Sequence, residues 1–327
     1  MRAAWYTMNG QARDVINIGD LPTPAPGPGE VRVMLMTSGV NPSDVKSRRA
    51  RPMTDALIVP HSDGAGVIDA VGAGVHSVTT GDRVWVWNGQ WQRPLGTAAT
   101  AIVLPQAQAV ALPDNTDFAA GACLGIPAMT AWHAVSLLGD IRGKSVLIVG
   151  AGSAVGHYAT QMAVLAGAQV IGTVGSPEKA RHAGAAGVAT IIDYKTEAVA
   201  ARVRELTAGR GADAIIDMDF SHTATLLTDG VLAAHGTLVC YGSNVNANIG
   251  IPFLTALFNS LSLRFFLVYD LLPAARLAAL AGLSQLLQRG QLAHTIGARF
   301  TLNEIVAAHE AVEQGKVVGN VVIDLAP

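Results

Sequence analysis

The stretch Val146-Leu147-Ile148-Val149-Gly150-Ala151-Gly152-Ser153-Ala154-Val155-Gly156 places an apolar run directly before glycines spaced as GxGxxxG. A segment rich in small residues follows at 158–168, and a second apolar run occupies 170–174. A strand, a glycine turn, a helix and a strand in this order are typical of a βαβ unit whose turn amides hold a pyrophosphate. The stretch therefore predicts a dinucleotide site and hydride-transfer chemistry.

The spacing of these glycines is one residue longer than the usual GxGxxG, so the alternative is an ordinary tight turn between packed elements. The position of the glycines, where the apolar period changes from strand to helix, favours the dinucleotide site. The turn residues that we expect at the cofactor are Gly150, Gly152, Ser153, Ala154, Val155 and Gly156.

The end of the second apolar run indicates which dinucleotide is bound. An NAD site usually has Asp or Glu about 20 residues past the glycines, where it accepts hydrogen bonds from the ribose hydroxyls. Here the run ends at Val174, followed by Gly175 and Ser176, with no acid at the tip. The small residues leave room for a 2′-phosphate, and Lys179 can add positive charge. We therefore predict NADPH; the alternative for Lys179 is a solvated lysine in a first helical turn.

Length and composition restrict the classes of protein. A chain of 327 residues with 50% hydrophobic content suits two domains and a large buried sheet. Net charge −2 without a basic stripe argues against nucleic acid as a partner, and no apolar run reaches the 18 residues of a membrane span. The N-terminus has no apolar signal core, and two cysteines are too few for a disulfide framework. We expect a soluble, cytoplasmic protein.

Two different sequence patterns divide the chain into domains. Residues 1–123 read as short strands separated by Gly and Pro, which is typical of a β-barrel, whereas strands and helices alternate over 124–266. We expect helices at 198–207 and 223–232, among others, and a final strand at 319–325. The fold class is α/β, with a doubly wound parallel sheet over 124–266 inserted between the two parts, 1–123 and 267–327, of the other domain.

Five motifs, in order along nearly the whole chain, carry a resemblance to a known family. They are Asn41-Pro42-Ser43-Asp44, His61-Ser62-Asp63-Gly64-Ala65-Gly66-Val67-Ile68, Gly81-Asp82-Arg83-Val84, Gly125-Ile126-Pro127-Ala128-Met129-Thr130-Ala131-Trp132 and the glycine turn. Together they resemble the zinc-independent quinone oxidoreductase branch of the medium-chain dehydrogenase/reductase superfamily. The resemblance implies a GroES-like catalytic domain, a Rossmann domain, NADPH as cofactor, a small-molecule quinone or carbonyl acceptor and a homodimer.

The resemblance also implies that no catalytic metal is bound. Zinc-dependent relatives hold zinc by residues whose matching positions here are Asn41, Ser62 and Ile126, none of which offers a thiolate or an imidazole. His61 is one place out of register. We expect no zinc, since a tetrahedral site needs at least three N, S or carboxylate ligands from the protein.

Without a metal, the acceptor must already be activated toward hydride, as quinones and enones are. Hydrogen bonds to the carbonyl oxygen then suffice as negative charge develops. We expect Asn41 to be a donor, with Ser62 and Asp63 in the adjoining wall; an Asx-type turn before Pro42 is the alternative for Asn41. Family members often carry a tyrosine where Lys46 stands. Lys46 can orient a carbonyl or contact a phosphate, or it is simply solvated.

Further cofactor contacts are carried over from the family one residue at a time. Tyr194 matches a tyrosine at the 2′-phosphate, and Lys316 lies near a basic residue that reaches the same group. Thr130 is expected near the nicotinamide or its ribose. Structural roles as a strand-end aromatic, a surface lysine and a helix-turn threonine are the alternatives. Contacts are also expected after the fifth strand, where open α/β sheets bind ligands, from Tyr241, Gly242 and Ser243.

Aromatic residues suggest the acceptor pocket and the dimer interface. Trp85, Trp87 and Trp91 can stack on a flat acceptor, with core packing as the alternative for the first two. The run 265–268 can pair two subunits edge to edge, or it is a buried strand.

The sequence therefore predicts a zinc-free, NADPH-dependent reductase of quinones or other conjugated carbonyls. An enoyl or 2-alkenal reductase acting on α,β-unsaturated carbonyls alone, and a non-catalytic NADPH-binding protein, remain the alternatives.

Overall fold

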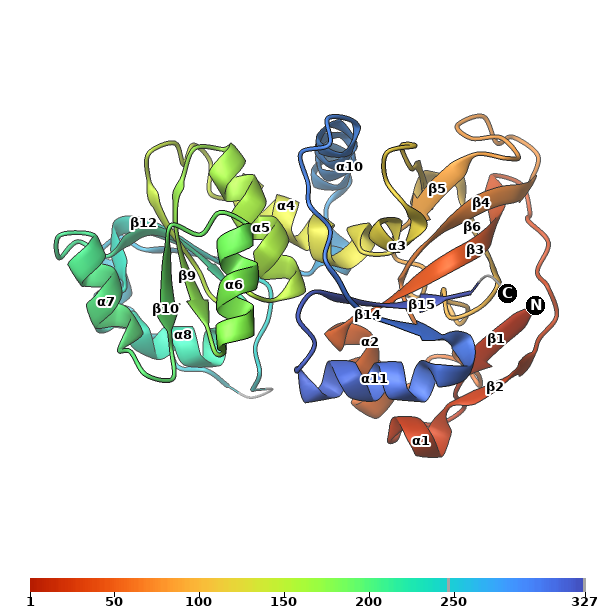
Figure 1. Cartoon of the computed structure of the whole chain (residues 1–327), viewed down its shortest axis with the longest axis horizontal. Coiled ribbons are helices and arrows are strands. Elements are labelled where there is room, and N and C mark those ends of the chain that lie inside the picture. Colours follow the sequence, from red (N-terminus) through yellow and green to blue (C-terminus); the bar gives the residue numbers. More distant parts are fainter. Residues whose placement is uncertain (246–247, 326–327) are drawn as a thin grey trace. The chain divides into compact units, whose positions relative to one another are not determined.

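The computed structural model describes residues 1–245 and 248–325, and the chain forms two compact units (Figure 1). The first unit comprises Met1–Pro127 and Leu280–Pro327, and the second comprises Ala128–Ala279. The second unit is thus an insertion between two segments of the first. Each unit has its own sheet, and each is described by itself below.

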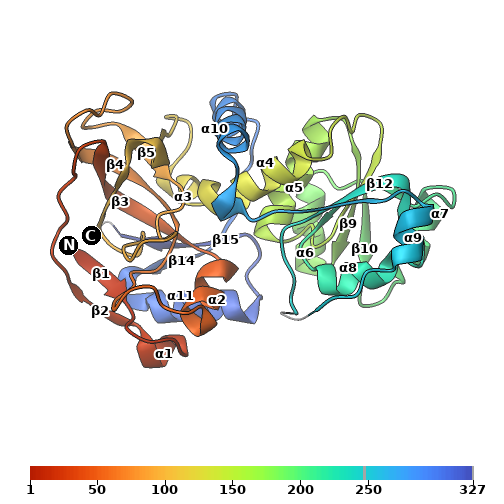
Figure 2. The ribbon, with the colours of Figure 1, turned by 180° about the vertical axis from the view of Figure 1, so that it is seen from behind.

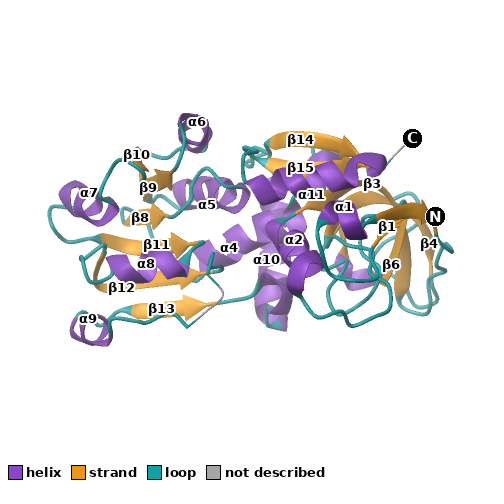
Figure 3. Ribbon diagram, turned by 90° about the horizontal axis from the view of Figure 1, so that it is seen from below, coloured by secondary structure: helices purple, strands orange, loops and turns teal. Residues whose placement is uncertain are grey.

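The second unit is built on a six-stranded, all-parallel sheet in the order β10-β9-β8-β11-β12-β13, which Figure 3 shows. Counted within this unit the order is 3-2-1-4-5-6, the order of a doubly wound dinucleotide-binding sheet. Central strand β8 is fully buried, which explains its continuous apolar sequence. The strands are β8 Ser145–Ile148, β9 Gln169–Val174, β10 Thr190–Asp193, β11 Ala212–Asp217, β12 Leu232–Cys240 and β13 Ser262–Phe265.

Polar caps and left-handed glycines set the helix limits of this unit. Ser153 caps α5, and Ser176 caps α6 with Pro177 at its first turn. The helix predicted over 223–232 is misplaced: α8 ends earlier, and Gly230, with φ of +72°, leads into β12. The helices are α4 Met129–Ser136, α5 Ala154–Leu165, α6 Pro177–Ala185, α7 Val199–Leu206, α8 Phe220–Leu226 and α9 Phe253–Phe258, with the 3-10 helix η3 Val268–Asp270.

The first unit contains a mainly antiparallel sheet in the order β14-β15-β3-β4-β5-β7, with β6 also pairing β3, and a separate pair β1-β2. This arrangement brings the last strand of the chain next to β3, so the two sequence segments share one core that includes Val33, Ile102 and Ile323. The strands are β1 Arg2–Trp5, β2 Asn17–Asp20, β3 Glu30–Val40, β4 Asp63–Val71, β5 Arg83–Val86, β6 Ala101–Pro105, β7 Ala109–Ala111, β14 Ile296–Thr301 and β15 Asn320–Asp324.

The helical elements of this unit are short apart from α2 and α11, and α10 contains the boundary between the units. They are α1 Ala12–Val15, α2 Pro42–Ala50, η1 Gln106–Gln108, α3 Phe118–Gly121, the π-helix η2 Leu124–Ala128, α10 Pro273–Gln288, η4 Leu302–Glu304 and α11 Ile305–Gln314. Within the described ranges, no helix is both long and apolar enough to cross a membrane.

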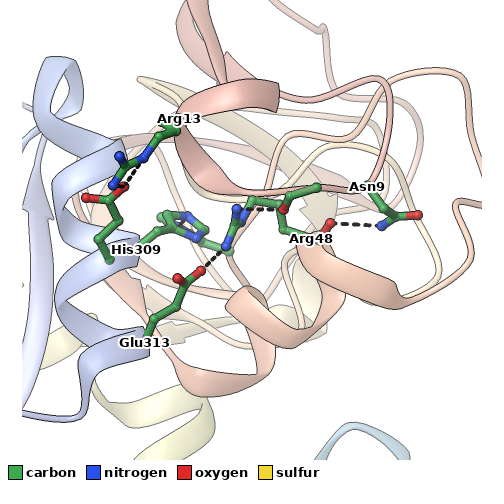
Figure 4. A network of polar contacts seen from close by, with 8 residues as sticks. Asn9, Arg13, Arg48, His309 and Glu313 are labelled. Atoms are coloured by element: carbon green, nitrogen blue, oxygen red, sulfur yellow. Dashed lines mark hydrogen bonds and ion pairs between the residues drawn. The ribbon is translucent and has the colours of Figure 1, made fainter.

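A buried arginine joins α2 to α11, which lie side by side in Figures 1 and 2. Arg48 is fully buried; its guanidinium pairs with Glu313 and donates to the Gly10 carbonyl at 2.8 Å (Figure 4). His309, nearby on α11, hydrogen bonds through Nε2 to Nε2 of His61 at 2.9 Å. Because an unpaired buried charge is costly, this network fixes α2 against the C-terminal segment.

Candidate functional site

The glycine turn between β8 and α5 is held by hydrogen bonds from two of its amides to side-chain hydroxyls. Ser153 Oγ accepts a hydrogen bond from the Gly156 amide at 3.0 Å, and Thr173 Oγ1 accepts one from the Gly150 amide at 3.0 Å. Gly150 has φ of +73°, a conformation that glycine adopts without strain. A helix start of this kind favours a bound anion.

Close approaches explain why the three motif glycines have no side chain. A Cβ atom on Gly156 would lie 2.2 Å from the Gly150 carbonyl oxygen, and one on Gly150 would lie 2.2 Å from Met218 Sδ. A Cβ atom on Gly152 would lie 2.7 Å from Lys179 Cβ. The turn is therefore packed tightly between α5, α6 and the segment after β11.

A cavity of about 390 Å³ opens beside this turn, at the carboxyl ends of β8, β9 and β11. This is where open α/β sheets bind ligands. The structure brings to it these residues predicted at the cofactor: Gly150, Gly152, Ser153, Gly175, Lys179 and Tyr194. The rest of the lining is Val149, Thr173, Val174, Val199, Met218, Asp219, His222, Thr223, Leu226 and Asn244.

The residues at the tip of β9 were predicted to leave room for a 2′-phosphate and to supply positive charge to it. Val174 is buried there, and among the described residues that line the cavity Lys179 is the only lysine or arginine. Tyr194, half exposed, lies over Gly175 so closely that a Cβ atom on this glycine would be 2.3 Å from Tyr194 Oη. The exposed Glu178 lies beside this tip. Hydrogen bonds from the Glu178 amide and from the Ser176 hydroxyl lower the pKa of its carboxyl group, which favours the ionised form.

Other residues predicted at the cofactor lie outside this lining. Ala154, Val155 and Gly156 form the first turn of α5, and Ser176 caps α6. Thr130 is buried in α4, and Lys316 is exposed in the first unit, after α11.

Tyr241, Gly242 and Ser243, predicted at the cofactor, do not line the cavity, but they form the segment that leads from β12 to the lining residue Asn244. The Gly242 carbonyl accepts from the Phe220 amide at 3.1 Å, and Ser243 Oγ donates to the Val245 carbonyl at 3.0 Å. Burial raises the pKa of Tyr241, and the negative charge of Asp217 reinforces this shift. These contacts position the loop whose next residue, Asn244, lines the cavity.

The sequence analysis missed several residues of the lining, above all Met218, Asp219, His222 and Asn244. Asp219 Oδ2 accepts from Asn244 Nδ2 at 2.7 Å, which ties the segment after β11 to the segment after β12. Both segments follow parallel strands, so the strand-end rule that selected 241–243 would also have selected 218 and 219. His222 comes one turn later and carries no comparable signal.

In the first unit, the segments that match the zinc-binding segments of zinc-dependent relatives contact one carboxylate, that of Asp63. Asp63 Oδ2 accepts hydrogen bonds from Asn41 Nδ2 at 2.9 Å and from the Ile126 amide at 3.1 Å. Asp63 is fully buried, and its Oδ1 has no hydrogen-bond partner among the described residues. A Cβ atom on Gly125 would lie 2.3 Å from that oxygen. Asp63, rather than Ser62, therefore stands at the centre of this site.

A second buried acid, Asp44, lies on the other side of Asn41. Its Oδ2 accepts from the Asn41 amide at 2.7 Å, and burial raises its pKa to about 7. Burial, reinforced by the charge of Asp44, raises the pKa of Asp63 well above its usual range. Asn41 is the N-cap residue of α2 and its main-chain amide donates to Asp44, while its side-chain amide donates to Asp63.

The remaining side chains here do not provide a metal site. Ser62 is buried, with its carbonyl accepting from the Gly89 amide at 2.9 Å, and Lys46 is exposed on α2. In the part of the chain that the structure describes, no group of three or more His, Cys, Asp or Glu side chains could hold a metal ion. An amide, a hydroxyl and one carboxylate do not fit the donor set of a catalytic zinc.

The tryptophans have separate positions. Trp85 is fully buried, as its core-packing alternative predicted, whereas Trp87 is partly exposed and donates to the Ala107 carbonyl at 3.2 Å. Trp91 is partly exposed, with the Arg51 guanidinium 5.3 Å from its ring centre.

Two family models match the chain. The alcohol dehydrogenase GroES-like domain matches residues 27–114, and the model described as a zinc-binding dehydrogenase matches residues 154–289. Among curated proteins, a quinone oxidoreductase of Pseudomonas aeruginosa is 34% identical over 95% of each chain. A 2-haloacrylate reductase of a Burkholderia species is 33% identical over 67% of this chain and 66% of its own.

Solved structures agree with the fold. A structure described as an NAD-dependent alcohol dehydrogenase has a TM-score of 0.89 and 30% identity, covering all of both chains. A mycobacterial protein complexed with NADPH has a TM-score of 0.86 and 27% identity, covering 99% of this chain and 100% of that one.

Proposed function

Because the chain belongs to the quinone oxidoreductases of the medium-chain dehydrogenase/reductase superfamily, it is an oxidoreductase, and we propose that it reduces quinones or other conjugated carbonyls with NADPH. The observation that carries the proposal is the cavity beside the glycine turn. Its position at the strand ends, the capped start of α5 and the small residues Gly175 and Ser176 after the tip of β9 together suit a phosphorylated dinucleotide.

The preference for NADPH rests on three residues at that tip. Gly175 leaves space, and Lys179 and Tyr194 line the side where a 2′-phosphate would lie. A lysine supplies charge to the phosphate, and a tyrosine supplies a hydroxyl. The NADPH complex of the mycobacterial structure supports this choice, whereas the name of the NAD-dependent structure makes a direct comparison of the two cofactors necessary.

NADPH, when bound, supplies the hydride, and the chain's own residues must position and polarise the acceptor. In this proposal Asn41 keeps one amide hydrogen on Asp63 and offers the other to the acceptor carbonyl. The raised pKa of Asp63 favours its protonated form, which keeps negative charge away from the developing enolate or hydroquinone. Zinc has no role in this scheme, because the donor set around Asn41 does not fit it.

Two more cofactor residues belong to the proposal. Thr130 is placed near the nicotinamide, and Lys316 near the 2′-phosphate, on the family resemblance alone. Two interpretations of Lys46 stay open: it contacts the carbonyl of the substrate or a cofactor phosphate, or it is a solvated surface lysine. A cytoplasmic location likewise stays a prediction from the sequence.

A homodimer is part of the proposal, with β13 as the contact. In the part of the chain that the structure describes, this strand is the edge of its sheet and pairs only with β12, and Figure 3 shows α9 beside it. The neighbouring surface is apolar, because Phe253, Leu254 and Phe258 are each more than 60% exposed. Exposed edges combined with apolar surface favour pairing with a second chain.

The alternative activity is reduction of α,β-unsaturated carbonyls alone. The name of the Burkholderia relative, a 2-haloacrylate reductase, supports it, since a haloacrylate is an unsaturated acid. A panel of quinones and enones, assayed with NADPH and NADH, separates the possibilities. NADPH oxidation by quinones supports the proposal, turnover of enones alone supports the alternative, and tight NADPH binding without turnover indicates a non-catalytic binding protein.

A further inference from the structure

Two fully buried histidines, His61 and His309, are joined through their rings in the first unit. Their Nε2 atoms lie 2.9 Å apart, and His61 stands two residues before Asp63. His61 has φ of +76°, a left-handed conformation that is uncommon for a residue with a side chain. Residues in such conformations are held there by their surroundings and cluster at functional sites, so we followed the contacts of this ring.

A chain of hydrogen bonds leads from the histidine pair to the main chain of Asp63. The Thr97 hydroxyl donates to the Asp63 carbonyl at 2.6 Å, and Ser38 Oγ lies 2.8 Å from Thr97 Oγ1. Ser38 Oγ also lies 2.9 Å from His61 Nδ1. Ser38 and Thr97 are fully buried, which shields these contacts from bulk water. The chain therefore connects α11, which carries His309, to the start of β4.

The two rings are neutral, which leaves one direction of donation along the chain. Burial lowers the pKa of His61 to about 3 and that of His309 well below its usual range. A carbonyl only accepts, so Thr97 uses its hydroxyl hydrogen on Asp63, and Ser38 must donate to Thr97. Ser38 then accepts from His61 Nδ1–H, which leaves His61 Nε2 without a hydrogen. His309 Nε2 therefore carries the hydrogen between the rings.

The surroundings of His309 agree with this assignment. With its hydrogen on Nε2, a neutral ring has no hydrogen on Nδ1, and His309 Nδ1 has no hydrogen-bond partner among the described residues. The Arg48 guanidinium, beside this ring in Figure 4, disfavours a second proton on it.

Thr97 also holds the main chain on both sides of Ser62. Its amide donates to the His61 carbonyl at 2.9 Å, and its hydroxyl donates to the Asp63 carbonyl. The Ser62 carbonyl accepts from the Gly89 amide at 2.9 Å. All three carbonyls of this segment are thus hydrogen bonded, which fixes the main chain from which the Asp63 side chain extends.

We infer that His309 is a positioning residue that acts through this chain on Asp63 and, through Asp63, on Asn41. The inference rests on the proposed function, which sets Asn41 on the acceptor carbonyl. The chain ends on a main-chain carbonyl, which neither takes up nor releases a proton, so it does not relay protons. Loss of the donor at 309 would leave His61 Nε2 as a buried acceptor without a partner, and the segment would lose its fixed position.

Three variants separate the hydrogen bond from the packing of the ring. His309→Phe keeps a ring against His61, whose ring centre lies 5.0 Å from that of His309, but removes the donor. His309→Gln supplies an amide N–H group as a replacement donor. His76→Gln changes an exposed histidine of the same unit and is the control.

The kinetic experiment measures NADPH oxidation in a single turnover, with menadione and with cinnamaldehyde as acceptors. His309→Phe should lower the rate about tenfold, as loss of one hydrogen bond predicts. The Kd of NADPH should stay the same, because no residue of the chain lines the cofactor cavity. His309→Gln should recover most of the rate, and His76→Gln should keep all of it.

A second pair of proteins tests whether His309 acts through Asn41. In an Asn41→Ala background, His309→Phe should change the rate less than about twofold, because the two effects share one path. A tenfold fall in both backgrounds, a glutamine variant as slow as the phenylalanine variant, or an equal fall in His76→Gln would overturn the inference.

NMR of the protein with isotopically labelled histidine and asparagine tests the chain without turnover. Wild type should show His61 protonated on Nδ1 and His309 protonated on Nε2 from about pH 5 to about pH 8. The Asn41 side-chain amide should exchange its hydrogens faster in His309→Phe. If these signatures are seen but no acceptor is reduced, the positioning chain stands and the proposed function fails. If acceptors are reduced but His309 is protonated on Nδ1, or Asn41 is unaffected, the inference fails and the proposed function stands.

Discussion

Asn41 donates its side-chain amide to Asp63 at 2.9 Å, so two residues 22 positions apart form one buried unit at the start of α2. The same carboxylate accepts from the Ile126 amide, and Asp44 accepts from the Asn41 amide. Asn41 thereby lies between two acids whose pKa values are both raised. Burial thus favours the protonated form of both carboxyl groups on either side of Asn41.

Lys179→Glu should weaken binding of NADPH far more than binding of NADH. The change reverses the only lysine or arginine charge in the cavity lining, which acts on the 2′-phosphate that NADH lacks. We expect a loss of roughly 10- to 100-fold in NADPH affinity and about twofold in NADH affinity. Fluorescence titration of both cofactors measures it, with the exposed Arg181→Glu of the same helix as control. An equal loss for both cofactors would refute the phosphate role.

Gly156→Ala should destabilise the second unit and abolish tight cofactor binding. The new methyl group would lie 2.2 Å from the Gly150 carbonyl oxygen, so the turn must move. We expect a loss of about 1–3 kcal/mol, as for other overpacked sites. Gly184→Ala in α6 is the control: its Cβ atom meets only Ile191 Cδ1 at 3.8 Å, so the protein should be stabilised by about 0.5–1 kcal/mol. Urea unfolding measures both, and a neutral Gly156→Ala would contradict the packing described here.

Asp44→Asn should change how stability depends on pH. The pKa of Asp44 is raised from 3.8 to about 7 on folding, so the native state binds more protons between these values, and its stability falls as pH rises from about 4 to about 7. Asparagine can accept the same Asn41 hydrogen bond without ionising. As pH rises from about 4 to about 7, the unfolding free energy of the variant should therefore increase relative to that of the wild type, by up to roughly 4 kcal/mol.

Urea unfolding at a series of pH values tests this expectation, with Asp55→Asn, an exposed change nearby, as the control. Asp63 is present in both proteins, but the charge of Asp44 contributes to its raised pKa, so the difference reports Asp44 together with its coupling to Asp63. A difference in unfolding free energy that does not vary with pH would show that Asp44 ionises as in an unfolded chain.

Phe258→Glu should convert the expected dimer into a monomer. Phe258 is 79% exposed on α9, beside edge strand β13, and a charge there would have to be buried on association. Sedimentation velocity measures the change. Met8→Glu, which alters an exposed apolar residue of the first unit, is the control. A wild-type protein that sediments as a monomer would refute the dimer outright.

The fold could be predicted from the sequence because its signals are local. The apolar run of β8, the glycines after it and the capping Ser153 each act within a few residues, and the strand order follows from the βαβ rule. Helix limits were less certain where no cap marks them: α8 starts at Phe220 without a side-chain cap, and its predicted range was shifted.

The candidate site was only partly predictable, because its lining comes from separate strand ends. Gly175 and Lys179 could be read from the sequence, since both follow β9 directly. Met218, Asp219 and Asn244 join the cavity only through the parallel order of β8, β11 and β12. The pairing of Asn41 with Asp63 depends on β3 lying beside β4, and no local pattern specifies it.

The most direct test of the central claim is a single-turnover assay with protein dialysed against a strong chelator. Loss of nicotinamide absorbance is followed after mixing the NADPH complex with a quinone or an enone. We expect the cofactor to be oxidised at the same rate before and after chelation, and Gly156→Ala to be inactive. Failure of every acceptor to oxidise bound NADPH, or activity that disappears on chelation and returns with zinc, would contradict the account.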